Sequence, residues 1–134
     1  MAGEAVSAPL RYGVSDSVVF TGRVSVAALQ AFYRHASIYV QPSFTEGFGL
    51  PVLEAMAAGV PVVVSDGGAL PEVVGAAGVT VHLGSEFVAQ LATQMKRLLH
   101  DSATQKKLVT MGYKQVRQFS WEVAAKQTFD VLIG

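Results

Sequence analysis

The sequence predicts an α/β fold, a Rossmann-like three-layer α/β/α arrangement around a parallel sheet, and three observations carry this prediction. Between Val18 and His82, short β-branched or aromatic runs alternate with stretches of helical spacing, a pattern typical of strands joined by crossover helices. The strand candidates are apolar throughout, as expected where helices cover both faces of a sheet. The length of 134 residues and the hydrophobic share of 51% suit one core. We therefore expect residues 1–134 to form a single domain.

We expect parallel strands near residues 18–20, 38–41, 61–65 and 79–82. Each strand is followed closely by residues that commonly end strands. These terminating residues are Gly22, Pro42, Asp66 and Gly84.

Helices are expected between and after these strands. The first follows Ser25 as its N-cap, and the second has Pro51 in its first turn and stops at Gly59. Further helices are predicted over residues 71–75, 86–99, 104–119 and 121–132. The helix over residues 104–119 is polar enough to lie on the outside, whereas Trp121 is expected to anchor the last helix by packing.

Composition excludes several classes of function. Ten Lys and Arg balance ten Asp and Glu, so the chain has no net charge and no basic stripe of the kind that binds nucleic acid. It has no cysteine, and its His and carboxylate residues lack the spacing of metal ligands. The longest uncharged apolar stretch, residues 55–64, is about half a membrane span. Because no secretory signal is recognisable, a cytoplasmic location is expected.

The informative stretch is residues 42–63, which is predicted to run from a strand through a glycine loop and a helix to the next strand. Gly47 and Gly49 allow the backbone to approach a ligand closely. The helix that follows directs free N–H groups and its positive dipole end toward the same space, which favours an anion such as a diphosphate. Ligands of open parallel sheets bind at the carboxyl ends of strands, which is where this loop is expected.

Two carboxylates frame this loop, Glu46 before the glycines and Glu54 in the helix. Carboxylates accept hydrogen bonds from paired hydroxyl groups, so an acidic pair beside an anion-binding helix end suits a sugar nucleotide. Taken alone, a glutamate near a helix N-terminus is more often a simple dipole interaction.

The pattern of Glu46, seven residues and Glu54, within residues 42–63, resembles the signature of family 4 retaining glycosyltransferases of the GT-B fold, the group 1 type. Residues 16–24, 67–74 and 119–122 resemble other landmarks of that family in the same order. The four landmarks span most of the chain.

The resemblance implies a donor site for a nucleotide diphosphate sugar, either GDP-mannose or a UDP-hexose, with no cofactor and no metal. Glu46 is the implied catalytic residue, contacting hydroxyls of the donor sugar, and Glu54 holds the ribose. Backbone groups around the glycine loop face the sugar and diphosphate, the segment before the first helix lines the base, and a later glycine shapes the wall. These donor-binding residues are Gly47, Phe48, Gly49, Leu50, Arg23, Val24 and Gly68.

In such enzymes the C-terminal domain starts with two further strands, and a separate N-terminal domain binds the acceptor. Neither is recognisable here, so the resemblance implies the C-terminal half of a GT-B fold without its first two strands. In the strand order 3-2-1-4-5-6, this leaves a gap between the strand near 18–20 and the strand near 38–41. Either the first strand moves inward to close the gap, or chains pair into a homo-oligomer, which we favour.

Two functions stay open at this point. The preferred one is the donor-binding part of a retaining glycosyltransferase that transfers a hexose, with mannose favoured, to a sugar or lipid-linked acceptor. The isolated chain is then expected to be inactive. The alternative is a non-catalytic nucleotide-sugar-binding or interaction module.

Overall fold

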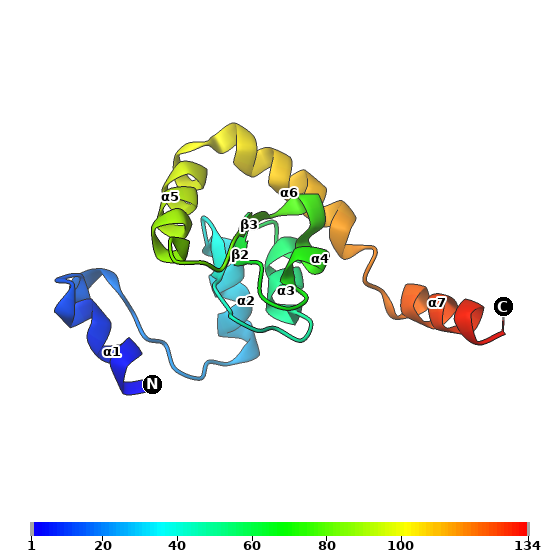
Figure 1. The fold of residues 1–134 in the computed structure, drawn as a ribbon, viewed down its shortest axis with the longest axis horizontal. Helices are drawn as coiled ribbons and strands as arrows, with labels where there is room; N and C mark the ends of the chain where they lie inside the picture. The colour runs from blue at the N-terminus through cyan, green and yellow to red at the C-terminus, as the bar shows by residue number, and fades with distance from the viewer. Residues whose placement is uncertain (1, 134) are drawn as a thin grey trace.

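The computed structural model describes residues 2–133, and its centre is a parallel sheet of three strands (Figure 1). The strands are β1 (Tyr39–Gln41), β2 (Val62–Ser65) and β3 (Val79–Val81), in the spatial order β1-β2-β3. Tyr39 lies opposite Val62 in one ladder, and Val63 lies opposite Val79 in the other. The strands predicted near residues 38–41, 61–65 and 79–82 are therefore confirmed, together with their parallel direction.

Helices connect and follow the strands. They are α1 (Ala2–Arg11), α2 (Val26–His35), α3 (Leu50–Ala57), α4 (Leu70–Val74), α5 (Phe87–His100), α6 (Ser102–Val116) and α7 (Trp121–Ile133), with short 3-10 turns η1 (Ser15–Ser17) and η2 (Gly75–Ala77). The predicted caps are present, because the Ser25 hydroxyl accepts from Ala28 N at 3.2 Å and the Ser120 hydroxyl accepts from Val123 N at 3.1 Å. Helix α6 starts earlier than predicted because the Asp101 carboxylate accepts from Thr104 N at 2.9 Å. Helix α1 was not predicted.

The central strand separates two apolar clusters, which makes the fold three-layered. Val62 and Val64 face one side of the sheet, where α3 and α4 pack. Val63 faces the other side, where it packs with Phe87 and Leu98 of α5. All three valines are completely buried, which explains why residues 62–64 of β2 are apolar. The predicted α/β/α fold is confirmed.

The strand predicted near residues 18–20 is wrong. These residues form no strand, and Val18, Val19 and Phe20 are 40%, 82% and 55% exposed. A strand is stable only when its N–H and C=O groups pair with a neighbour, and no described residues offer one beside this segment. The less favoured alternative, that this segment moves inward to pair beside Val40, is wrong for the same reason, because β1 pairs only with β2 in the described chain.

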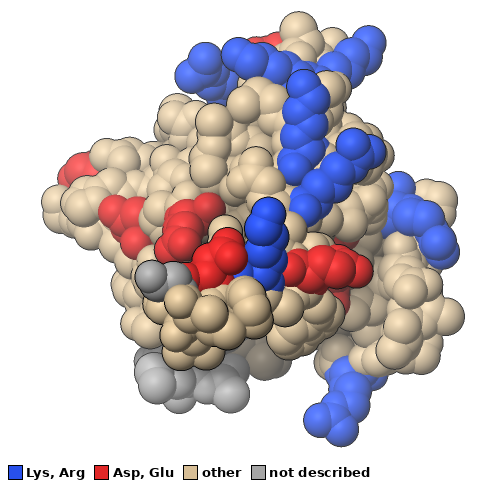
Figure 2. Space-filling view, turned by 90° about the vertical axis from the view of Figure 1, so that its right-hand side faces the viewer, with Lys and Arg blue, Asp and Glu red and all other residues tan. Residues whose placement is uncertain are grey.

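Helices α1 and α7 lie away from the three-layer body, at opposite sides of the molecule (Figure 1). Trp121, expected to be a packing anchor, is 91% exposed at the start of α7, so that prediction is wrong. Figure 2 shows Lys and Arg mostly in the upper and right-hand parts of this face and Asp and Glu mostly across its middle, where a basic side chain also lies among the acidic ones. Within the described residues, no helix has both the length and the hydropathy needed to cross a membrane.

Replacing Met56, which is 1% exposed in the α3 layer, tests this assignment of the core. Met56→Ala removes buried contacts and leaves a cavity, so it should lower the free energy of unfolding by about 2–5 kcal/mol. Phe20→Ala, the matched control outside the sheet, should change it by less than about 0.5 kcal/mol. Urea unfolding followed by circular dichroism measures both. An equal loss for the two variants would contradict the placement of residues 18–20 outside the core.

Candidate functional site

The glycine loop after β1 ends at the N-terminus of α3, as predicted. Gly49 is the N-cap residue of α3 and has φ 93°, a left-handed conformation that side chains other than glycine rarely adopt. Its carbonyl accepts from Val52 N at 3.0 Å and from Leu53 N at 3.3 Å, which starts the helix. Gly49 is buried, and a Cβ there would lie 3.0 Å from the Leu70 side chain. Glycine at this position therefore brings the first turn of α3 close against α4.

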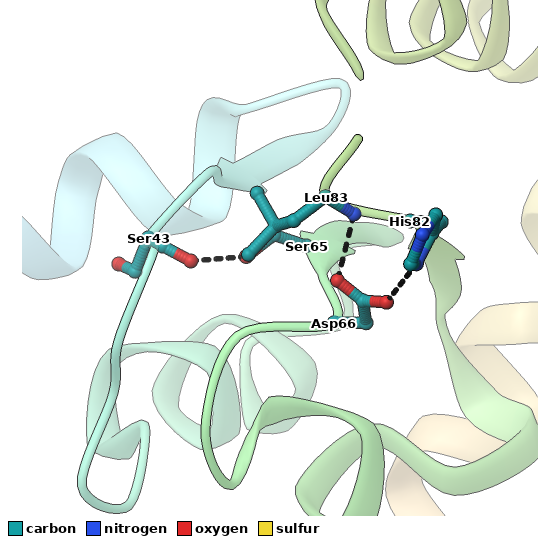
Figure 3. A network of polar contacts seen from close by, with 5 residues as sticks. All are labelled: Ser43, Ser65, Asp66, His82 and Leu83. Carbon is teal, nitrogen blue, oxygen red and sulfur yellow. Dashed lines mark hydrogen bonds and ion pairs between the residues drawn. The ribbon is translucent and has the colours of Figure 1, made fainter. Parts of the chain in front are cut away.

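A second glycine turn, at the carboxyl end of β2, packs its backbone on the first loop. A Cβ on Gly67 would overlap the carbonyl oxygen of Ser43, and a Cβ on Gly68 would overlap the backbone of Glu46. Ala69 N donates to the Glu46 carbonyl at 3.0 Å. The Ser65 hydroxyl donates to the Ser43 carbonyl at 2.5 Å, in the network of Figure 3. The loops after β1 and β2 therefore form one wall at the carboxyl edge of the sheet.

Asp66 ties the same turn to the end of β3 (Figure 3). Its Oδ1 accepts from Leu83 N at 2.8 Å, its Oδ2 pairs with His82 Nδ1 at 2.5 Å, and its own N–H donates to the Val81 carbonyl at 3.0 Å. The hydrogen bonds from His82 and Leu83 hold the pKa of the Asp66 carboxyl below its ordinary value of 3.8. The ionised carboxylate is thus the form that fits this turn.

The Glu46 side chain is half-buried in this wall and is held at both oxygens. Gln41 Nε2 donates to its Oε2 at 2.7 Å, and Gly47 N donates to its Oε1 at 3.1 Å. The Tyr39 hydroxyl donates to Gln41 Oε1 at 2.5 Å. A half-buried carboxylate held this way has a defined direction before any ligand arrives.

Glu54 lies on α3 and accepts a hydrogen bond from α2. The Tyr33 hydroxyl donates to Glu54 Oε2 at 3.0 Å, and the Tyr33 side chain is only 7% exposed. Burial, followed by this hydrogen bond, raises the pKa of the Tyr33 phenol well above its ordinary value. A cavity of about 450 Å³ opens between the two helices. Its lining includes Val26, Leu29, Gln30, Tyr33, Arg34 and Glu54.

The structure places both carboxylates within electrostatic reach of one phenol. Burial raises the pKa of Tyr39, and the charges of Glu54 and Glu46 raise it further. The Tyr33 and Tyr39 rings are in contact, with centroids 5.7 Å apart. The two glutamates, eight positions apart in the sequence, therefore belong to one region of the surface.

The other predicted site residues lie in different surroundings. Gly47 and Gly68 are exposed at the wall, Leu50 is 60% exposed in the first turn of α3, and the 44% exposed Phe48 packs edge-on against Phe119 at 5.8 Å. The remaining two predicted site residues precede α2. Arg23 is exposed and Val24 is half-buried, and neither side chain makes a hydrogen bond or ion pair with another described residue.

Sequence reasoning missed three polar residues of this region. The sequence pattern singles out neither Tyr33 nor Gln41, and it indicates Asp66 only as a residue that ends a strand. Side chains alternate along a strand, so Tyr39 and Gln41 lie on one face of β1. This alternation is a signal in the sequence from which Gln41 could have been identified. Among residues 2–133, no three His, Cys, Asp or Glu side chains lie close enough together to hold a metal ion.

Comparison with known proteins identifies the family. The model of the family described as "Glycosyl transferases group 1" matches residues 7–115. The chain belongs to this glycosyltransferase family. The resemblance inferred from Glu46, Glu54 and the neighbouring landmarks is thereby confirmed.

Several relatives of this glycosyltransferase chain are named mannosyltransferases. O-antigen chain mannosyltransferase B of Escherichia coli is 40% identical over 111 residues, covering 83% of this chain and 29% of that protein. The MMP alpha-(1->4)-mannosyltransferase of Mycolicibacterium hassiacum is 40% identical over 121 residues, covering 89% of this chain and 29% of that protein. The chain therefore spans less than a third of the length of these relatives.

Solved structures of glycosyltransferases have the same fold. Sucrose-phosphate synthase from Thermosynechococcus elongatus superposes with a TM-score of 0.79 at 31% identity, covering 96% of this chain and 33% of that one. The C-terminal domain of a glycosyl transferase group 1 family protein from Francisella tularensis superposes with a TM-score of 0.74 at 30% identity, covering 88% and 61%. The architecture is thus shared with GT-B enzymes.

The hydrogen bonds of Asp66 predict an acid-dependent contribution to stability. Because the pKa of Asp66 is lower in the folded chain than in the unfolded one, this contribution is present above the unfolded value and is lost as the pH falls through the lower folded value. Asp66→Asn should therefore flatten the decline in unfolding free energy below about pH 4. Asp130→Asn, an exposed control on α7, should leave the decline unchanged. Urea titrations between pH 2 and pH 7 measure both, and identical curves for Asp66→Asn and the unmodified chain would contradict the assigned role.

Proposed function

We propose that this chain binds the nucleotide-sugar donor of a retaining glycosyltransferase, whose reaction transfers a hexose to a sugar or lipid-linked acceptor. The observation that carries the proposal is the wall at the carboxyl edge of the sheet. There the N-terminus of α3 lies beside a carboxylate, Glu46, that is already held in a fixed direction. An anionic group with attached hydroxyls is the ligand class that suits both features.

In this proposal the donor diphosphate lies at the N-terminus of α3. The dipole of α3 and the backbone N–H groups of Phe48, Gly49 and Leu50 attract the diphosphate and stabilise the charge that grows on it as the bond to the sugar breaks. Glu46 accepts hydrogen bonds from sugar hydroxyls, and Glu54 accepts them from the ribose. Gly68 is exposed and has no side chain, so the sugar can lie close to the backbone there. The segment of Arg23 and Val24 lines the base.

The displacement is proposed to occur at the front face of the sugar, so the anomeric configuration is retained. No cofactor or metal enters this proposal. The chain supplies the donor half of the reaction, and an acceptor-binding domain is the proposed partner. Transfer then takes place in the cytoplasm.

Mannose is the favoured sugar, with GDP-mannose as donor. Two mannosyltransferase relatives at 40% identity support this choice. A UDP-hexose is the second candidate, because the relatives also include one from Streptomyces bingchenggensis whose name, D-inositol 3-phosphate glycosyltransferase, does not specify mannose.

A non-catalytic nucleotide-sugar-binding or interaction module is the alternative function. The short coverage of the relatives, 29% of their length, favours it, because groups needed for turnover can lie outside these 134 residues. Calorimetric titration with GDP, UDP and their sugars, combined with a sugar-transfer assay, separates the two. Binding with transfer supports an enzyme, binding without transfer supports the module, and no binding would contradict both.

Glu54 is predicted to contribute to the affinity for the nucleotide. Glu54→Ala should weaken binding of GDP or UDP by roughly 1.5–3 kcal/mol, because charge-assisted hydrogen bonds to ribose hydroxyls are lost. Calorimetry measures the change, with Asp130→Ala on α7 as the control. Equal affinities for Glu54→Ala and the unmodified chain would remove Glu54 from the proposed site.

Glu46 is predicted to distinguish the sugar-bearing donor from the bare nucleotide. Glu46→Ala should weaken binding of GDP-mannose by roughly 1.5–3 kcal/mol and change the affinity for GDP far less, because only the sugar hydroxyls contact this carboxylate. The ratio of the two dissociation constants is the quantity to measure. An equal loss for both ligands would show that Glu46 does not face the sugar.

A further inference from the structure

Two tyrosines and a glutamine connect the carboxylates of the proposed donor site. We propose that Tyr33 is a positioning residue for Glu54, and that Gln41, itself oriented by Tyr39, is a positioning residue for Glu46. This inference rests on the proposed function. It adds to that function the groups that hold each carboxylate in its binding direction.

The contact between Tyr33 and Glu54 joins a rigid group to a flexible one. Glu54 lies on the exposed side of α3, where its side chain would otherwise sample many rotamers. Tyr33 is buried against the core and donates to Oε2 at 3.0 Å. No described residue donates to Oε1, so that oxygen stays open to a ligand hydroxyl. Because the pKa of Tyr33 is raised, the phenol keeps the proton that it donates over the physiological pH range.

Tyr39 holds the Gln41 amide in the orientation that donates to Glu46. Tyr39 and Gln41 are two residues apart on β1 and lie on the same face of the strand. The Glu46 carboxylate can only accept, so it requires the Nε2 end of the amide, and the Tyr39 hydroxyl donates to the other end, Oε1, at 2.5 Å. In this orientation Nε2 donates to Glu46 Oε2 at 2.7 Å and to Ser43 Oγ at 3.3 Å. The amide therefore presents a donor to Glu46.

The two arrangements meet at the rings of Tyr33 and Tyr39. The Tyr33 and Tyr39 rings pack with centroids 5.7 Å apart and planes inclined by 59°, so neither ring can turn without disturbing the other. Both rings belong to or pack against the apolar cluster under α3. The carboxylates are thus oriented by groups that the core already holds, which lowers the entropy lost when a donor binds.

Removing individual polar groups tests the proposal. Tyr33→Phe keeps the ring and deletes the hydroxyl, and it should weaken GDP binding by the 134-residue chain about three- to tenfold. Gln41→Met keeps the length and deletes the amide, and it should weaken GDP-mannose binding by a similar factor while leaving GDP binding unchanged. Tyr12→Phe, which removes an exposed hydroxyl outside the wall, is the matched control. Thermal unfolding of each variant monitors the fold.

A double variant distinguishes positioning from a general loosening of the fold. In a Glu54→Ala background, Tyr33→Phe should cause no further loss of GDP affinity, because the group it orients is absent. A further loss there, or an unchanged affinity of the single variant Tyr33→Phe, would overturn the role of Tyr33. Equal losses of GDP and GDP-mannose affinity in Gln41→Met would overturn the role of Gln41.

The same titrations separate this inference from the proposed function. If the unmodified chain binds GDP or GDP-mannose but the variants bind equally well, the positioning roles are wrong and the donor-binding function stands. If the unmodified chain binds none of GDP, UDP, GDP-mannose and UDP-glucose, the proposed function is wrong, and the positioning roles are overturned with it.

Discussion

The backbone contact between the loops after β1 and β2 is the constraint on which the candidate site depends. Gly67 and Gly68 bring their backbone so close to residues 43–46 that a side chain on either glycine would overlap it. Hydrogen bonds from Ala69 N and the Ser65 hydroxyl join the same two loops. This packing fixes the backbone of Glu46, and the side-chain contacts of Glu46 then fix its carboxylate. Without the two glycines, the carboxylate could not lie against the wall in this way.

The sheet explains why these loops meet. All three strands are parallel, so their carboxyl ends lie at one edge and each following loop starts there. The central strand β2 is buried on both faces and pairs on both sides, which makes it the most constrained element. Asp66 lies directly after β2, and its contacts with Leu83 and His82 connect this strand to the end of β3. The hydrogen bonds of Asp66 thus hold the loops after β2 and β3 in fixed positions relative to the core.

The outer parts of the chain expose apolar side chains that the central part buries. Residues 18–20, α1 and α7 carry large apolar side chains that are exposed, including Val19 at 82% and Trp121 at 91%. Apolar surface of this extent is typical of regions that meet another protein surface. The chain spans 29% of the length of its mannosyltransferase relatives, so an acceptor-binding domain is one proposed partner. Self-association through the same surface stays a prediction.

The sequence by itself determined the features that depend on nearby residues. Ser25 and Ser120 cap helices through hydrogen bonds that reach three residues along the chain, and Gly49 marks the start of α3 through its own backbone conformation. The three parallel strands and the family followed from apolar runs and from the spacing of Glu46 and Glu54. Such signals are readable because every participant lies within one short segment.

Only the tertiary structure decided the features that depend on distant residues. Tyr33 and Glu54 are 21 positions apart, and His82 and Asp66 are 16 apart, so no local pattern relates the members of either pair. Residues 18–20 look like a strand in sequence, but a strand needs a neighbouring strand to pair with, and the described chain places none there. Trp121 looks like a packing anchor, but the helix that carries it lies away from the body. Local propensity proposes an element, and pairing and burial across the fold decide whether it forms.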